Sequence, residues 1–242
     1  MVPEGIQLLP HALEALADVW LLPLPPGDRV EETLTACLSP EEHAHLSKLS
    51  RPEVQIRFAS TRHALRVLLG GTLGVSPARL RLQTNSFGKP SLADNHPGPP
   101  LWFNVTHSHS VALLAISRHG EVGVDVELLR PMPDALKLAE RFFCPAEHQL
   151  LAGLEEAIQS EAFLRMWTVK EAFVKAIGEG LAHPIHEVEI TLGGPGGLAV
   201  QGIHPRAGKP ARLAFAALDA LSGFATMLVL LAGPDVPLSA AR

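Results

Sequence analysis

The helix and strand patterns of this chain occur twice in the same order, and this repetition constrains the fold more than any other feature. In the first half, SPEEHAHL starts a helix, because Ser39 is a helix-capping residue and Glu42 lies three residues beyond the cap. A longer helix is predicted over about 53–70, ending at a pair of glycines. Strand-like pieces follow around 79–84, 101–106 and 111–117.

The second half repeats this order. It opens with the strand VGVDVEL, continues with helical patterns near 134–142 and from PAEHQLLAGL, and reaches a long helix that ends at Gly178. Strand patterns then fill much of 186–231. We therefore predict an α+β fold of two similar lobes, residues 1–118 and 119–242, joined near 117–121. The similarity is one of element order, since no repeat of the sequence itself is visible.

Composition places the chain among ordinary globular proteins. Of its 242 residues, 47% are hydrophobic and 19% are charged, which is enough to bury a core. No apolar run approaches the roughly 18 residues that span a bilayer, so we expect no membrane insertion. A net charge of −5 argues against a nucleic-acid binder. Cys37 and Cys144 lie far apart and no leader opens the chain, so free thiols and a cytoplasmic location are expected.

Positive charge is concentrated in one segment. From Lys48 to Pro90 the chain has eight lysines or arginines and one acid, Glu53. Such a segment attracts anions and acidic partners.

Two carboxylates share one face of the strand that opens the second half. In EVGVDVE the valines alternate with Gly123, Asp125 and Glu127, so a strand places the valines on one face and both acids on the other. Mg²⁺ commonly takes one or two carboxylates together with phosphate oxygens and water. A strand that merely shows its acids to solvent has the same pattern.

The long second-half helix carries an aromatic residue, an acid and a base on one stripe. In WTVKEAFVKAIGEGL, Trp167, Glu171 and Lys175 are four residues apart and lie above one another, with Lys170 beside them. An ordinary i,i+4 salt pair between Glu171 and Lys175 also explains the stripe.

Two shorter motifs contain further bases. FNVTHSHS presents His107 and His109 two residues apart, but the acid and third histidine of a metallohydrolase do not follow. His107 is either a phosphate donor or a structural histidine at a strand end. FGKP is a turn, and it lacks phosphate-loop spacing, so Lys89 acts only as a point charge.

Together these residues are typical of a phosphoryl-group transferase. Acids that hold a divalent cation and bases that hold phosphates suit catalysis by positioning and electrostatic stabilisation. No Ser-His-Asp or Cys-His pattern supplies a nucleophile from the chain. The nucleophile is therefore expected from the second substrate.

GVDVE followed by WTVKEAFVKAIGEGL resembles the paired signature of the 4′-phosphopantetheinyl transferases, in the pseudo-dimeric Sfp-type class. FGKPSL, FNVTHS and RFFCPAEHQLL also resemble that family's blocks, in the family's order. The resemblance runs from about residue 35 to about residue 192. It implies two lobes with coenzyme A and Mg²⁺, or Mn²⁺, in the cleft between them.

The resemblance also implies a reaction. The family moves the phosphopantetheine arm of coenzyme A onto a serine of an apo acyl or peptidyl carrier protein and releases adenosine 3′,5′-bisphosphate. By matching positions, Asp125, Glu127 and Glu171 would be the metal ligands, and Glu171, directly or through a metal-bound water, would be the base. The expected contacts to the phosphates of coenzyme A are made by Lys175, Lys89, His107 and Thr106.

Two departures from the family pattern bear on coenzyme A binding. Thr106 stands where the family usually has serine, which keeps the hydroxyl. Basic residues for the 3′-phosphate and adenine are poorly matched, and Arg51, Arg57 and Arg66 are the nominated ones. A metal-dependent phosphohydrolase and a non-catalytic binder of coenzyme A or a carrier are the rival functions. A chain that holds both lobes needs no partner copy, so a monomer is expected.

Overall fold

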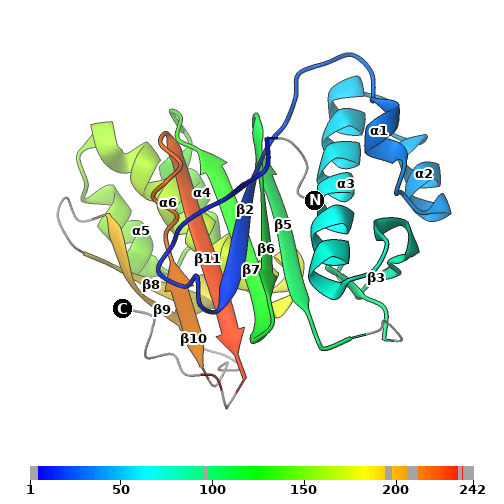
Figure 1. Cartoon of the computed structure of the whole chain (residues 1–242). Helices are drawn as coiled ribbons and strands as arrows, with labels where there is room; N and C mark the ends of the chain where they lie inside the picture. Colours follow the sequence, from blue (N-terminus) through cyan, green and yellow to red (C-terminus); the bar gives the residue numbers. More distant parts are fainter. Residues whose placement is uncertain (1–4, 95–97, 194–197, 206–211, 234–235, 237–242) are drawn as a thin grey trace.

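A computed structural model of the chain describes residues 5–94, 98–193, 198–205, 212–233 and 236. The strands of its two larger sheets lie between two groups of helices (Figure 1). The first group contains α1 (Glu32–Thr35), α2 (Pro40–Leu46) and α3 (Pro52–Leu73), and the second contains α4 (Ala135–Phe142), α5 (Pro145–Ala152) and α6 (Glu156–Ile177). Short 3₁₀ turns occupy Pro77–Arg79, Gly180–Ala182 and Ile185–Glu187.

The first half of the chain forms a four-stranded antiparallel sheet. Its strands are β1 (Gln7–Leu8), β2 (Ala17–Pro23), β5 (Trp102–Ser108) and β6 (Val111–Ser117), in the order β1-β2-β6-β5. A small hairpin of β3 (Leu82–Thr84) and β4 (Pro90–Leu92) precedes β5. Leucines of α3 pack against β6 in one shared hydrophobic cluster, which fixes the helix on this sheet.

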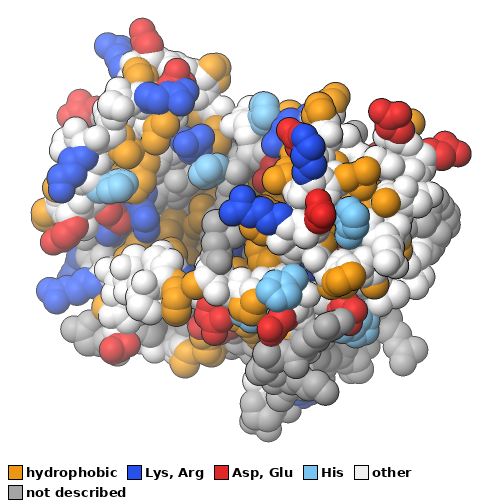
Figure 2. All heavy atoms as spheres, turned by 180° about the vertical axis from the view of Figure 1, so that it is seen from behind, with side chains coloured by type: hydrophobic (Ala, Val, Ile, Leu, Met, Phe, Trp, Pro, Cys, Tyr) orange, Lys and Arg blue, Asp and Glu red, His pale blue; other side chains and the backbone are white. Residues whose placement is uncertain are grey.

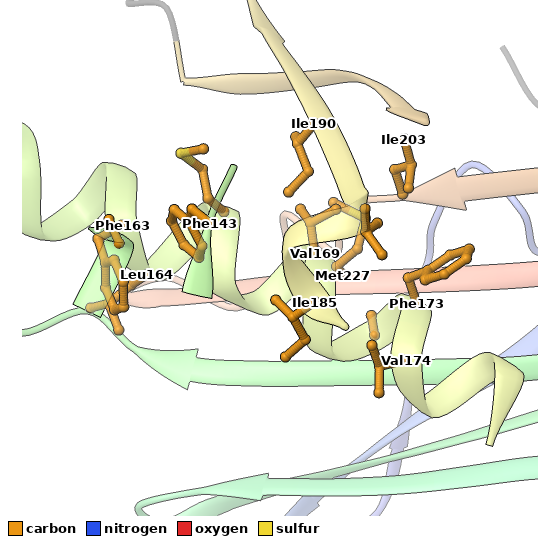
Figure 3. Packing of buried hydrophobic residues seen from close by; sticks show 14 of the residues in the cluster. Phe143, Phe163, Leu164, Val169, Phe173, Val174, Ile185, Ile190, Ile203 and Met227 are labelled. Carbon is orange, nitrogen blue, oxygen red and sulfur yellow. The ribbon is translucent and has the colours of Figure 1, made fainter. Parts of the chain in front are cut away.

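The second half forms a three-stranded sheet and a separate hairpin. The sheet has the order β10-β11-β7, with β7 (Gly120–Leu128), β10 (Leu213–Ala216) and β11 (Phe224–Ala232). The hairpin pairs β8 (Val188–Gly193) with β9 (Ala199–Pro205). Buried side chains of α6, including Val169 and Phe173, pack between the sheet and the hairpin (Figure 3). This packing holds α6 against β7.

The α+β fold is confirmed, and so is the helix start at Ser39. The Ser39 hydroxyl accepts from the N–H of Glu42, and the Glu42 carboxylate accepts from the N–H of Ser39. Strand β2 was not predicted, because ADVWLLP lacks the regular alternation of a half-buried strand. The pseudo-twofold pairing of two lobes stays a prediction. Both cysteines are free and buried, and no described helix is long and apolar enough to cross a membrane.

Candidate active site

Strand β7 has both faces covered, and α6 lies directly on one of them. Val122, Val124 and Val126 are buried on the face away from α6, as the alternation predicted. On the other face, a Cβ atom at Gly123 would overlap the Ala172 carbonyl oxygen and the Ala176 nitrogen. Gly123 therefore makes room for the backbone of α6.

Asp125 is the most enclosed acid of the site. Its side chain is 5% exposed, and its Oδ1 accepts from Lys175 Nζ at 2.6 Å and from the Thr106 hydroxyl at 2.9 Å. Lys175 Nζ also donates to Thr106 Oγ1 at 3.0 Å. Asp125 Oδ2 is buried and has no hydrogen-bond partner. One oxygen of the carboxylate is thus neutralised, and the other is available to a further ligand.

Glu127 and Glu171 lie close enough to Asp125 to influence one another. Burial raises the pKa of Glu127, and the charge of Asp125 raises it further, whereas Arg130 at 3.6 Å lowers it. Burial also raises the pKa of Glu171, with Lys175 lowering it and both neighbouring acids raising it. Lys175 pairs with Asp125, and among the described residues no ion pair joins it to Glu171. The i,i+4 alternative is therefore not what the structure shows.

The three acids are of a residue type that binds divalent cations, but their present spacing does not form a metal site. In the described part of the chain, no group of three or more histidine, cysteine, aspartate or glutamate side chains is arranged to hold a metal ion. The buried, unpartnered oxygen of Asp125 and the mutual repulsion of the acids are nevertheless what a cation would relieve. The residues present therefore suit Mg²⁺.

Trp167 anchors α6. Its ring packs edge-on against Phe142 of α4, with centroids 5.5 Å apart, and stacks on Phe163 at 6.0 Å. These contacts fix the rotation of α6 about its axis, and so the direction in which Glu171 and Lys175 point.

Lys170 is fully buried, which no pattern in the sequence predicted. Its ammonium lies 2.8 Å from Glu147 Oε2 and also donates to the carbonyls of Ile185 and Val188. Glu147 in turn accepts from the N–H groups of Cys144 and Ile190. The only local signal was Glu147 in the helix start CPAE, where it completes a capping box.

His107 lies at the surface of β5, near Arg57 of α3. Desolvation by neighbouring atoms lowers the pKa of His107, and the charges of Arg57 and Lys175 lower it further. His109 is in the β5–β6 turn with φ 53°, outside the strand. The two histidines therefore do not form a metal pair among the described residues.

Lys89 joins the first half of the chain to the C-terminal end of α6. Its ammonium lies 2.5 Å from Glu121 and donates to the carbonyl oxygens of Ala176 at 2.8 Å and Val122 at 3.3 Å. Asn85, in the same turn, donates to the Gly178 carbonyl at 2.8 Å. Burial lowers the pKa of Lys89. The turn is thus hydrogen-bonded to the C-terminal end of α6, a role that its sequence did not indicate.

The three nominated arginines have different surroundings. Arg51 is exposed and lies 3.5 Å from Glu53, whereas Arg57 influences His107. The Arg66 side chain is 1% exposed, and its guanidinium binds Glu42 at 2.6 Å and two backbone carbonyls. This placement indicates a structural role for Arg66 in place of the expected contact with coenzyme A.

Part of the positive charge lines a groove between α2 and β3. The groove has a volume of about 800 Å³, and Arg79 and Arg81 on its wall have no charged partner among the described residues. Figure 2 shows a hollow beside the part that α1–α3 form, and lysine and arginine side chains spread over that part with acidic side chains among them. An anionic molecule is the natural ligand of such a surface.

Acids that suit a cation, next to bases that suit phosphates, define an enzyme that acts on a phosphate-containing substrate. The model of the 4′-phosphopantetheinyl transferase superfamily matches residues 121–217, a range that contains β7 and α6. The chain is 40% identical to the 4′-phosphopantetheinyl transferase HetI of a Nostoc species over 76% of its length and 78% of that protein. It is 41% identical to the putative 4′-phosphopantetheinyl transferase slr0495 of a Synechocystis species, over 70% of its length and 68% of that protein. It is 28% identical to Sfp of Bacillus subtilis, over 68% and 76%. The chain belongs to this superfamily and is a transferase of its kind.

Proposed function

We propose that the protein transfers the 4′-phosphopantetheine group of coenzyme A to a serine of an apo acyl or peptidyl carrier protein. The observation that carries this proposal is the contact of Asp125 and Lys175, both inside the segment that matches the superfamily, with each other and with Thr106 of β5. The rival hydrolase and binder receive no support from a specific contact. We further propose that the enzyme is of the Sfp-type class, acts as a monomer in the cytoplasm, and has its site between lobes 1–118 and 119–242.

The reaction exchanges one phosphorus–oxygen bond for another. The serine hydroxyl oxygen attacks the phosphorus that bears the pantetheine arm, and the anhydride bond to the 5′-phosphate of the nucleotide breaks. The bonding electrons leave with adenosine 3′,5′-bisphosphate, and the serine proton is taken up by a base. Glu171 is the proposed base: burial raises its pKa in the free protein, and a cation bound beside it would lower that pKa again.

The acids and bases of the site have complementary tasks in this proposal. Asp125, Glu127 and Glu171 would hold Mg²⁺, or Mn²⁺ in its place. When bound, the ion supplies positive charge to the pyrophosphate oxygens. Lys175 and Lys89 provide fixed positive charge, and His107 and Thr106 provide hydrogen-bond donors for the phosphates. The nominated Arg51 and Arg57 stay candidates for the nucleotide end of coenzyme A.

The mass of an apo carrier protein tests the proposal directly. The carrier is incubated with the protein, coenzyme A and Mg²⁺, and its intact mass is then measured. We expect a gain equal to one phosphopantetheine arm, which is lost in Glu171→Gln and in the presence of a chelator. Coenzyme A consumed without modification of the carrier would indicate a hydrolase. Coenzyme A left intact with several unmodified carrier types would indicate a binder.

A further inference from the structure

Strands β5 and β7 lie side by side, although they belong to different sheets. Each is the last strand of its own sheet, so each has an edge that faces the other. The N–H of Leu129, just after β7, donates to the carbonyl of Gly223 beside β11. Because the N–H groups of a strand point alternately to its two sides, those of the even-numbered β7 residues point toward β5.

Side chains of β5 take the place of a backbone ladder at this edge. Asn104 Oδ1 accepts from the N–H of Val124 at 3.0 Å, and Ser108 Oγ accepts from the N–H of Leu128 at 3.1 Å. Both β5 side chains are buried, with exposed fractions of 5% and 8%. Water therefore competes little for these bonds, and each satisfies a donor that would otherwise be buried without a partner.

The two bonds bracket the acids of the site. Val124 directly precedes Asp125, and Leu128 directly follows Glu127. A shift of β7 by two residues along β5 would leave the same side chains on the same faces of the strand. The hydrophobic pattern alone therefore does not determine where along β5 the two acids lie. The bonds from Asn104 and Ser108 fix the register of β7 against β5.

We propose that Asn104 and Ser108 are positioning residues of the transferase site. Their hydrogen bonds hold the backbone of β7 in the register along β5 at which Asp125 and Glu127 meet Lys175 and the phosphates. Asn104 does so without touching either acid. The inference rests on the proposed function, because that reaction is what requires the two acids at this position along β5. Misplacement of a reacting group by about 1 Å can lower a rate about 100-fold.

Ser117 serves as a control for Ser108, because comparing the two distinguishes a positioning role from an effect on stability alone. Ser117 Oγ accepts from the N–H of His119 at 3.0 Å and donates to the Leu16 carbonyl at 2.8 Å, and the residue is 2% exposed. Ser108→Ala and Ser117→Ala each remove one buried hydroxyl with a backbone donor, and only the Ser108 hydroxyl also donates to an acid of the site, Glu127 Oε2, at 3.4 Å. We expect similar losses of melting temperature in both. Only Ser108→Ala should lower kcat for carrier modification, by about 10- to 100-fold with a smaller change in KM for coenzyme A.

Binding of Mn²⁺ to the protein alone gives a second readout. Followed by electron paramagnetic resonance, it should weaken about 10-fold in Ser108→Ala and Asn104→Ala, stay unchanged in Ser117→Ala, and recover in Ser108→Thr. If Asn104→Ala does not fold, the comparison of Ser108→Ala with Ser117→Ala still tests the proposal. A wild-type protein that binds Mn²⁺ but modifies no carrier would refute the proposed function, while the Mn²⁺ affinities would still test the positioning role. Wild-type kcat and Mn²⁺ affinity in Ser108→Ala, with a stability loss equal to that of Ser117→Ala, would overturn the proposal.

Discussion

Lys175 Nζ lies 2.6 Å from Oδ1 of Asp125, and this contact joins helix α6 to strand β7. The carboxylate is buried, whereas the lysine side chain is 27% exposed. The ammonium is therefore the charge that compensates Asp125 in the absence of any other cation, and the second oxygen of Asp125 stays without a partner.

Lys175→Met should destabilise the fold by about 1–3 kcal/mol, because it leaves a buried carboxylate with only the Thr106 hydroxyl. We expect Mg²⁺ to raise the melting temperature of this variant more than that of the wild type, since the cation then replaces the ammonium. Thermal denaturation with and without Mg²⁺ measures both effects. Lys137→Met is the control, because Lys137 pairs with Asp134 at the exposed surface and should matter by less than about 0.5 kcal/mol. An equal response of Lys175→Met and the wild type to Mg²⁺ would contradict this account of the charge.

The sequence was most informative where the pattern is local. The alternation in EVGVDVE predicted which side chains of β7 share a face, and the four-residue spacing predicted that Trp167, Glu171 and Lys175 share a stripe. Partners far along the chain have no such period. Nothing near Lys175 indicated Asp125 as its ion-pair partner, and nothing near Asn104 indicated the N–H of Val124.

The same limit explains the residues whose roles differ from the expectation. Arg66 looked like a free base, but its partner Glu42 lies in another helix. Lys170 was placed only beside the stripe, and its buried ion pair with Glu147 lies far along the chain from it. Tertiary contacts determine these roles, and the periodicity of hydrophobic residues does not predict such contacts.

Lys170→Met should destabilise the fold strongly, by about 3–5 kcal/mol, because it leaves the Glu147 carboxylate buried without a countercharge. Burial lowers the pKa of Lys170, which shows that the ammonium itself is costly there. In Lys170→Met/Glu147→Gln the charge is gone, while the amide oxygen can still accept a backbone N–H. The double variant should therefore be more stable than Lys170→Met alone in urea denaturation. A double variant less stable than the single one would show that the pair does not act through its charge.

Binding of coenzyme A should be linked to uptake of a proton by His107. In the free protein, desolvation by neighbouring atoms and the charges of Arg57 and Lys175 lower the pKa of His107, which favours the neutral imidazole at pH 7. Phosphate oxygens beside the ring would raise this pKa, because they favour the charged form. Affinity for coenzyme A should therefore increase as the pH falls through the range in which His107 titrates in the complex.

Calorimetric titration in buffers of different ionisation enthalpy measures this proton uptake. His107→Gln should abolish the uptake while it keeps a hydrogen-bond donor, and a half-buried histidine of α5, His148, supplies the control. Equal uptake in wild type and His107→Gln would assign the proton to another group.

Gly123→Ala should disrupt the contact between β7 and α6. The added methyl carbon would overlap the Ala172 carbonyl oxygen and the Ala176 nitrogen, and both are backbone atoms that cannot turn aside. Helix α6 must move away from the strand, which carries Lys175 away from Asp125. We expect loss of carrier modification by at least about 100-fold and a lower melting temperature.

The matched control for this change is Gly71→Ala, in the interior of helix α3. A Cβ atom there meets nothing within 4 Å. Alanine is favoured over glycine inside a helix by about 0.5–1 kcal/mol, so this variant should melt at a higher temperature than the wild type and keep its activity. The two substitutions are chemically identical and differ only in what the methyl group meets. Full activity in Gly123→Ala would mean that the site tolerates a wider separation of α6 and β7 than the ion pair between Lys175 and Asp125 allows.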